Sequence, residues 1–129
     1  MSLYHDAEII DVSIDGLNSF GRIKVKAVNG IVSNIELDGL IAFRCEDLTM
    51  QNVVSRVLQS IEGTFSTEEL QYWVTWVTSL SDCGSRLKEQ KKSEWLDSLI
   101  NKKTNLIMFE PSAGATIAAI CRGVQIYGD

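Results

Sequence analysis

Residues that could carry out covalent chemistry are few in this sequence of 129 residues, and they are widely separated. Cys83 lies in a Ser-Asp-Cys-Gly-Ser segment, and a cysteine nucleophile needs a neighbouring base or cation that stabilises its thiolate. The only histidine, His5, is close to the N-terminus. We therefore interpret Cys83 as a small residue at the end of a helix, and a cysteine-dependent enzyme is the least favoured hypothesis for function.

Metal ligands and paired catalytic carboxylates form no recognisable pattern either. The three cysteines are too far apart in sequence for a zinc site or a Cys-x-x-Cys redox pair. Glu68 and Glu69 are explained by the start of a helix, and Glu46 and Asp47 by the solvated end of a strand. The sequence thus predicts no catalytic residue, no metal site and no cofactor, and it favours a protein that is not an enzyme.

The segment 111–116, Pro-Ser-Ala-Gly-Ala-Thr, is the best candidate for binding a small ligand. If residues 115–122 formed a helix, its first N–H groups could hold an anion, together with Ser112, Gly114 and Thr116. A phosphate-binding loop would contain more glycine and a lysine, which are missing here. We therefore prefer a plain hairpin turn at this place, and we keep an anion-binding domain as the alternative function.

A helix at residues 66–80 is the element around which we expect the chain to be organised. Ser66 and Glu69 have the spacing of a capping box, in which each side chain bonds to the backbone N–H of the other residue. Apolar residues then recur at helical spacing and must dock on the sheet. These residues are Leu70, Trp73, Val74 and Val77.

Two further aromatic residues of this helix, Tyr72 and Trp76, are four positions apart and about 100° round from Trp73. Either they widen the buried face of the helix, or they form an exposed aromatic pair that contacts another protein. Tyr72 and Trp76 are therefore the candidate partner-binding residues.

The net charge of −5 restricts the class of partner. An acidic chain repels phosphate backbones, so we expect no binding to nucleic acid. A basic protein is the favoured partner, and a second copy of the chain is the other possibility. In bulk character alone, short, acidic and α+β, the chain is similar to immunity or antitoxin-like proteins, which would imply neutralisation of a basic partner by charge complementarity. No motif carries this similarity.

The location of the protein is also suggested by composition. No apolar run reaches about 18 residues, so we expect no membrane span. The N-terminal residues lack the basic and apolar regions of a signal peptide. Cys45, Cys83 and Cys121 are odd in number and fit a reducing compartment. We therefore predict a cytoplasmic protein.

Alternating apolar residues predict four strands before the helix, at residues 7–15, 22–27, 31–37 and 40–46. A three-residue loop at 28–30 places Ile23 opposite Ile35 and keeps the apolar faces together, with Gly30 in the left-handed conformation. The same reasoning at Leu37-Asp38-Gly39 places Ile35 opposite Ile41. The inward residues are then Ile10, Val12, Ile14, Ile23, Val25, Ala27, Ile31, Ser33, Ile35, Ile41, Phe43 and Cys45.

The rest of the chain gives the remaining elements. Residues 50–61 fit a fifth strand that continues the meander, with a helix as a near-equal alternative. A second helix is predicted at 87–101, a strand at 106–109, a turn at 110–114 and a strand at 115–127, bulged or closely approached at Gly123. The predicted fold is a single α+β domain, residues 1–129. It consists of an antiparallel β-meander, open or curled into a partial barrel, with two consecutive helices packed on it and a C-terminal β-hairpin that returns to the sheet.

Overall fold

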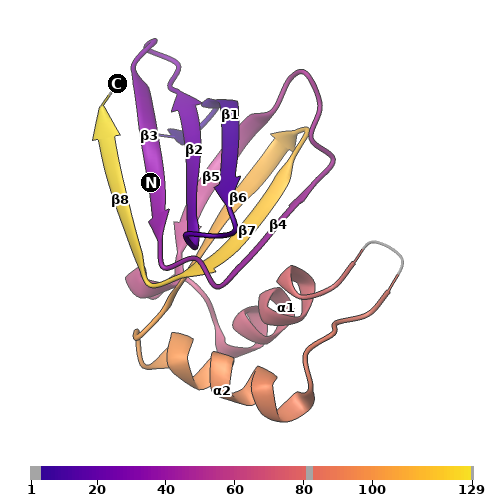
Figure 1. Cartoon of the computed structure of the whole chain (residues 1–129). Coiled ribbons are helices and arrows are strands. Elements are labelled where there is room, and N and C mark those ends of the chain that lie inside the picture. The colour runs from indigo at the N-terminus through magenta and orange to yellow at the C-terminus, as the bar shows by residue number, and fades with distance from the viewer. Residues whose placement is uncertain (1–3, 81–82, 129) are drawn as a thin grey trace.

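The computed structural model describes residues 4–80 and 83–128 and has the predicted α+β fold (Figure 1). The described residues form one eight-stranded antiparallel sheet in the order β4-β7-β6-β5-β1-β2-β3-β8. The strands are β1 Glu8–Asp15, β2 Phe20–Lys26, β3 Val32–Asp38, β4 Ala42–Glu46, β5 Val53–Gln59, β6 Asn105–Ala113, β7 Thr116–Cys121 and β8 Gly123–Gly128. The helices are α1 Thr67–Val77 and α2 Glu89–Ile100, with a short 3₁₀ helix, η2, at Ser60–Glu62.

The first hairpin register is confirmed. Ile23 lies opposite Ile35, and the Ala27 N–H donates to the Ile31 carbonyl at 2.9 Å across the three-residue loop. Gly30 has a φ of 88°, the left-handed conformation that the loop requires. The strands β1, β2 and β3 therefore form the predicted meander, and Ile23, Val25 and Ile35 are buried.

The second predicted hairpin, between residues 31–37 and 40–46, is wrong. Strand β3 pairs with β8, where Ile35 lies opposite Ile126, and β4 pairs with β7, where Phe43 lies opposite Ala119. The chain turns a corner at Gly39 instead, and the Arg122 N–H donates to the carbonyls of Asp38 and Gly39 at 2.9 and 3.2 Å. This pairing is preferred because it lets the apolar C-terminal segment bury residues 117–121 completely.

Strand β1 carries a bulge that alters its predicted pattern. Ile9 lies opposite Val25 and Asp11 opposite Lys24, so Ile10 is the extra residue. Ile9 is therefore the buried residue, while Ile10, predicted to face inward, is 45% exposed. Val12 still packs against the core as predicted.

Residues 50–61 contain strand β5, which confirms the strand and excludes the helical alternative. Its neighbours are β6 and β1, so it does not continue the meander from β4. The helix considered for residues 115–122 is also wrong, because this segment is β7. Strand β6 runs on to Ala113, through most of the predicted turn at 110–114, because Pro111 lies at an irregularity of the β5–β6 ladder where the missing N–H is tolerated.

Two apolar clusters hold the molecule together. One lies inside the curled sheet and includes Ile23, Ile35, Ile107, Phe109 and Ile117. The other lies between the opposite face of β6 and β7 and the two helices; its members include Leu70, Val74, Val77, Leu99, Leu106, Met108, Ala118 and Ile120. Strands β6 and β7 are therefore buried on both faces, with alternate residues in each cluster.

The capping box of the first helix is confirmed. The Glu69 N–H donates to the Ser66 hydroxyl at 3.1 Å, and the Ser66 N–H donates to the Glu69 carboxylate at 2.8 Å. The helix ends at Val77, three residues earlier than predicted, with Thr78 as its C-cap. Within the described residues, neither helix has the length and apolar character needed to cross a membrane.

Candidate functional site

Trp76 of α1 meets Arg44 of strand β4, which lies 32 residues earlier in the sequence. The Arg44 guanidinium carbon lies 4.4 Å from the centroid of the Trp76 ring, and its Nη1 donates to the Trp76 carbonyl at 2.9 Å. The second terminal nitrogen of Arg44, Nη2, donates a hydrogen bond to the Glu46 carboxylate. A guanidinium over an indole face is held by the charge distribution of the ring, so Arg44 keeps Trp76 in one orientation.

Three rings follow one another along the helix surface. Tyr72 and Trp73 are 5.1 Å apart at an interplanar angle of 89°, and Trp73 and Trp76 are 5.3 Å apart at 77°. Trp73 and Trp76 are partly buried against the cluster beneath the helices, whereas Tyr72 is 60% exposed. The predicted pair thus splits: Trp76 belongs partly to the core, and Tyr72 presents its ring to solvent. We call Tyr72, Trp73 and Trp76 the aromatic surface.

A groove of about 370 Å³ lies beside the aromatic surface, between β4 and the segment that follows α1. Arg86 and Arg44 supply positive charge to its wall, and Glu46 supplies a carboxylate. The remaining lining residues are Phe43, Cys45, Val77, Thr78, Ser79 and Leu80.

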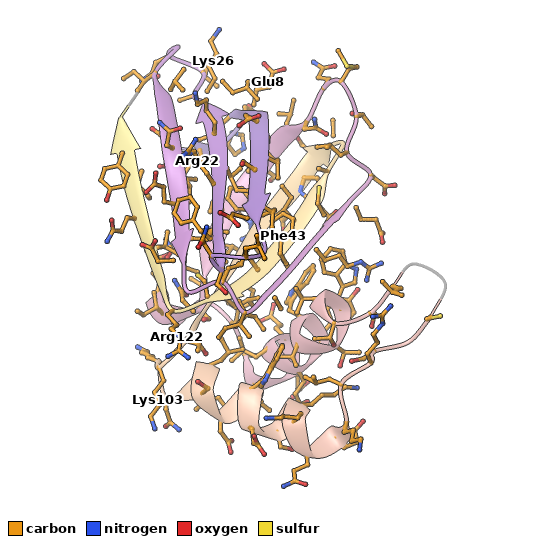
Figure 2. The ribbon with its side chains drawn as sticks, in the orientation of Figure 1. Glu8, Arg22, Lys26, Phe43, Lys103 and Arg122 are labelled. Carbon is orange, nitrogen blue, oxygen red and sulfur yellow. The ribbon has the colours of Figure 1, made fainter. Side chains whose placement is uncertain are left out.

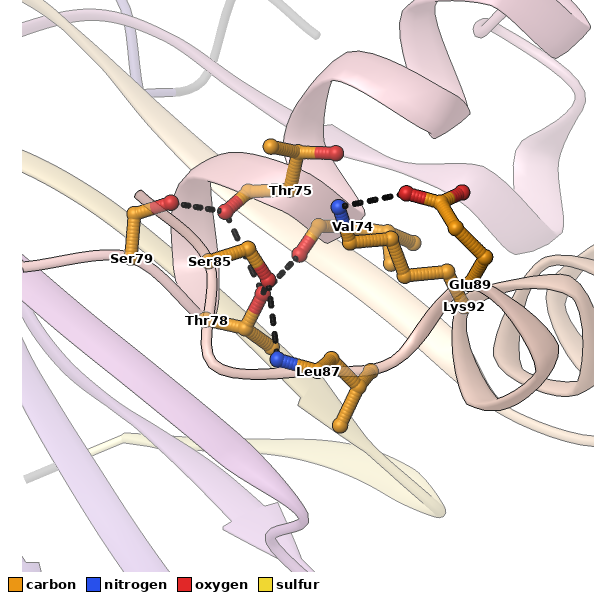
Figure 3. Close-up of polar contacts among 8 residues, drawn as sticks. All are labelled: Val74, Thr75, Thr78, Ser79, Ser85, Leu87, Glu89 and Lys92. Carbon is orange, nitrogen blue, oxygen red and sulfur yellow. Dashed lines mark hydrogen bonds and ion pairs between the residues drawn. The ribbon is translucent and has the colours of Figure 1, made fainter. Parts of the chain in front are cut away.

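Hydroxyl groups fasten the described part of the chain after α1 to the helix end (Figure 3). The Thr78 hydroxyl donates to the Val74 carbonyl at 2.8 Å, and the Ser79 hydroxyl donates to the Thr75 carbonyl at 2.6 Å. Thr78 also shares a hydrogen bond with Ser85, whose hydroxyl accepts from the Leu87 N–H. These hydrogen bonds hold Thr78, Ser79 and Ser85 against the C-terminal end of α1, beside the groove.

Acidic residues precede the aromatic surface on the same helix. Glu68 and Glu69 lie in the first turn of α1, and both are exposed. Residues three and four positions apart are neighbours on a helix surface, so Tyr72 follows both carboxylates on one side of α1. The exposed tyrosine is therefore flanked by negative charge.

The predicted ligand residues lie at the β6–β7 turn. Gly114 has a φ of 79°, and a Cβ atom there would lie 2.5 Å from the Asn52 Oδ1. The Ala115 N–H donates to that same oxygen at 3.1 Å. Ser112 is exposed and Thr116 begins β7. The geometric basis of the anion site, a helix starting at residue 115, does not exist, so anion binding here stays a prediction without that support.

Asn52 is the residue of this region that sequence reasoning missed. It is buried, and its Oδ1 also accepts from the Thr49 N–H at 3.0 Å. Its amide nitrogen donates to the Thr49 carbonyl at 2.7 Å. Asn52 thus joins two loops that are 63 residues apart in sequence, a role for which the local sequence contains no signal.

The cysteines are all unpaired, and two of them are shielded from ionisation. Burial raises the pKa of the Cys45 thiol, and it raises the pKa of Cys121 to about 11. Cys83 is exposed, and its N–H donates to the Leu80 carbonyl at 3.2 Å. Within the described residues, no three side chains of the types His, Cys, Asp and Glu gather where they could hold a metal ion.

Comparison of the chain with models of protein families, with curated proteins and with solved structures gives no match. Neither a shared family nor a shared fold therefore bears on function here.

Proposed function

We propose that this protein is a non-catalytic interaction module that binds a basic protein partner through the aromatic surface of α1. The observation that carries this proposal is the exposed ring of Tyr72, held edge-on against Trp73 at 5.1 Å. Tyrosine and tryptophan are enriched among the residues that contribute most to protein–protein binding. A tyrosine whose ring is already held loses little conformational freedom when a partner covers it.

Packing beneath the aromatic surface supports the proposal. Trp73 lies on the cluster below the helices, and Arg44 covers one face of Trp76. Because the supporting residues are bound to the sheet, the surface keeps its shape before a partner arrives. Covering a large aromatic side chain typically contributes about 1.5–3 kcal/mol, which suits Tyr72 as an anchor.

Charge supports a basic partner. The chain carries a net charge of −5, and Glu68 and Glu69 lie beside Tyr72 on α1. Opposite charges on two proteins accelerate their encounter and disfavour wrong partners. The three unpaired cysteines fit a reducing compartment, so we propose that the two proteins meet in the cytoplasm. An acidic protein that binds a basic partner would act like the immunity or antitoxin-like proteins that the chain resembles in bulk character.

Affinity capture from the native host tests the proposal, with the wild-type chain, Tyr72→Ala and Tyr127→Ala as baits. Tyr127 is the matched control, because it is also a half-exposed tyrosine but lies on β8. We expect quantitative mass spectrometry to find one basic protein that wild type and Tyr127→Ala retain and that Tyr72→Ala loses by about tenfold or more. Repeated capture without such a protein would argue against the proposal, as would equal loss with both variants.

A second copy of the chain is the competing occupant of the same surface. Sedimentation velocity at increasing protein concentration distinguishes it from a different partner. If the chain dimerises, and if Tyr72→Ala abolishes the dimer while Tyr127→Ala leaves it intact, the surface binds a second copy of the chain and not a basic partner.

A further inference from the structure

The curled sheet has an opening in its wall. Strand β1 pairs with β2 along its length, apart from the bulge at Ile10. On its other side, among the described residues, Glu8 lies opposite Val53 of β5, and the last backbone hydrogen bond is that of the Ile9 N–H to the Asn52 carbonyl at 2.8 Å. In the part of the chain that the structure describes, no strand pairs with residues 11–15 on that side. Strand β4 forms one end of the strand order, and among the described residues it pairs only with β7. We call the opening bounded by β1, residues 39–41, β4 and residues 47–52 the window.

Two hollows lie along the window. The first, of about 300 Å³, is lined by residues from both sides, including Ile14 and Asp15 of β1 and Ala42 and Phe43 of β4. The second, of about 430 Å³, lies between residues 8–12 and the loop before β5. Figure 2 shows Phe43 near the end of β1. One hollow lies at the start of β1 and the other at its end, so together they could receive the side chains of a segment that lies along β1.

Apolar side chains at the window are incompletely covered. Val12, Leu40, Phe43 and Cys45 pack against the inner core but are only partly buried. Exposed apolar residues surround them, namely Ile10, Ile14, Ile41, Leu48 and Met50. An unpaired strand edge next to partly covered core residues has both the backbone groups and the apolar surface needed to accept another strand.

The paired edge of β1 shows which sequence pattern this strand accepts. On β2, Arg22, Lys24 and Lys26 alternate with the buried Ile23 and Val25. The two apolar residues lie opposite Val12 and Ile9 of β1, and Lys24 and Lys26 lie opposite Asp11 and Glu8. A strand that alternates apolar and basic residues therefore matches both faces of β1.

Charge at the window favours the same pattern. Glu8 and Asp11 line the larger hollow and Asp15 lines the smaller one, whereas the described residues that line either hollow include no lysine or arginine. We propose that the window binds an extended segment of a partner protein, with alternating apolar and basic residues, as an added strand on β1. This inference concerns a different surface from α1 and does not depend on the function proposed above.

The probe for this site is an acetylated and amidated peptide with the sequence of Phe20–Ala27, Phe-Gly-Arg-Ile-Lys-Val-Lys-Ala, carrying a fluorophore. Its binding is measured by fluorescence anisotropy. A peptide of the same composition with its basic residues consecutive is the control for charge. We expect the alternating peptide to bind at least about tenfold more tightly, because only alternation places basic and apolar side chains on opposite faces.

Backbone pairing is tested with a peptide N-methylated at alternate residues on the side that would face β1. Losing several backbone hydrogen bonds should weaken binding by about tenfold or more, without any change to the protein. Hydrogen exchange should show new protection at residues 11–15 when the unmethylated peptide is bound. Equal binding of all peptides, or new protection confined to another strand, would overturn the proposal.

A charge-reversed variant tests the location independently. Asp11→Lys should weaken binding of the alternating peptide about fivefold, whereas Asp97→Lys, an equal charge change at an exposed position of α2, should leave it unchanged. Equal weakening by both variants would mean that only the overall charge matters, and the proposal would fail. Concentration-dependent protection of residues 11–15 without peptide would assign the window to a second copy of the chain instead.

Discussion

Cys121 is fully buried at the end of β7. Its side chain has no exposed surface, and its thiol lies 3.8 Å from the Asn105 carbonyl, to which it donates. Burial raises the pKa of this thiol to about 11, whereas the unfolded chain would release the proton near pH 9. Between these two pH values, the folded state retains a proton that the unfolded state has lost.

Stability should therefore fall as the pH rises through this range. The contribution of the Cys121 thiol is complete below about pH 9, and about 2 kcal/mol of it is lost by about pH 10.5. We predict that the free energy of unfolding in urea decreases more steeply between about pH 8 and pH 10.5 for wild type than for Cys121→Ala. The alanine variant keeps the lysines and tyrosines that also titrate there, so equal slopes would contradict the prediction.

At the same scale, Arg44 shows what the sequence could and could not predict. Alternation placed Arg44 on the face of β4 opposite Phe43, and it lies there. That α1 covers this face could not be predicted, because Arg44 and Trp76 are 32 residues apart and a cation–π contact has no local signature. The strand pattern gave the direction of the side chain, but its partner depends on the tertiary fold.

At the scale of elements, the turn between β6 and β7 depends on one glycine. Gly114 has a φ of 79°, and a Cβ atom would meet the Asn52 Oδ1 at 2.5 Å and the Gln51 carbonyl at 2.7 Å. Gly30 has a φ of 88° in the first hairpin, but a Cβ atom there would meet no atom of the described residues within 4 Å. A substitution at either glycine would therefore strain the backbone, but only at Gly114 would the new side chain also collide with neighbouring atoms.

Alanine substitution should separate these two effects. We predict that Gly30→Ala destabilises the protein by about 1 kcal/mol through backbone strain, and Gly114→Ala by about 2–4 kcal/mol, because Asn52 must also move. Urea denaturation followed by circular dichroism measures both. If the two variants lose equal stability, the contact between Gly114 and Asn52 does not limit the turn.

Two similar triplets, Val28-Asn29-Gly30 and Leu37-Asp38-Gly39, show why the local sequence predicted one hairpin correctly and the other wrongly. Gly30 and Gly39 both adopt the expected positive φ, but only the triplet at 28–30 forms a hairpin loop. At Gly30 the flanking strands pair with each other. At Gly39 a Cβ atom would lie 2.8 Å from the Arg122 side chain, because the C-terminal segment passes there and pairs with both flanking strands. Local chemistry specifies the turn, whereas the pairing partner is decided by burial of distant residues.

At the scale of the whole molecule, the fold class followed from the sequence, but the arrangement of the layers did not. We expected the helix to cover the apolar face of the meander. Instead, Ile23, Val25 and Ile35 pack inside the curled sheet against β5, β6 and β7, and the helices cover the other face of β6 and β7. The continuous apolar run at 106–109 is consistent with burial on both faces, although alternation in the meander pointed to a single core.

Burial on both faces makes β6 and β7 the centre of the molecule, and this has a measurable consequence. Both strands are paired on each side, and residues 105–109 and 117–121 are buried. Their amide protons should exchange with solvent only when the whole molecule unfolds, because no smaller opening exposes them. In native-state hydrogen exchange, we predict that these amides share the largest free energy of exchange, equal to that of global unfolding.

Strand β1 provides the internal comparison for that measurement. Among the residues that the structure describes, 11–15 have a strand partner on one side only, so we expect their exchange to be faster than that of β6 and β7. If β1 exchanged as slowly as β7 without a bound peptide, the window would have to be closed in solution. The same result would remove the free edge on which strand addition depends, so hydrogen exchange of the unbound protein tests the core and the proposed binding surface together.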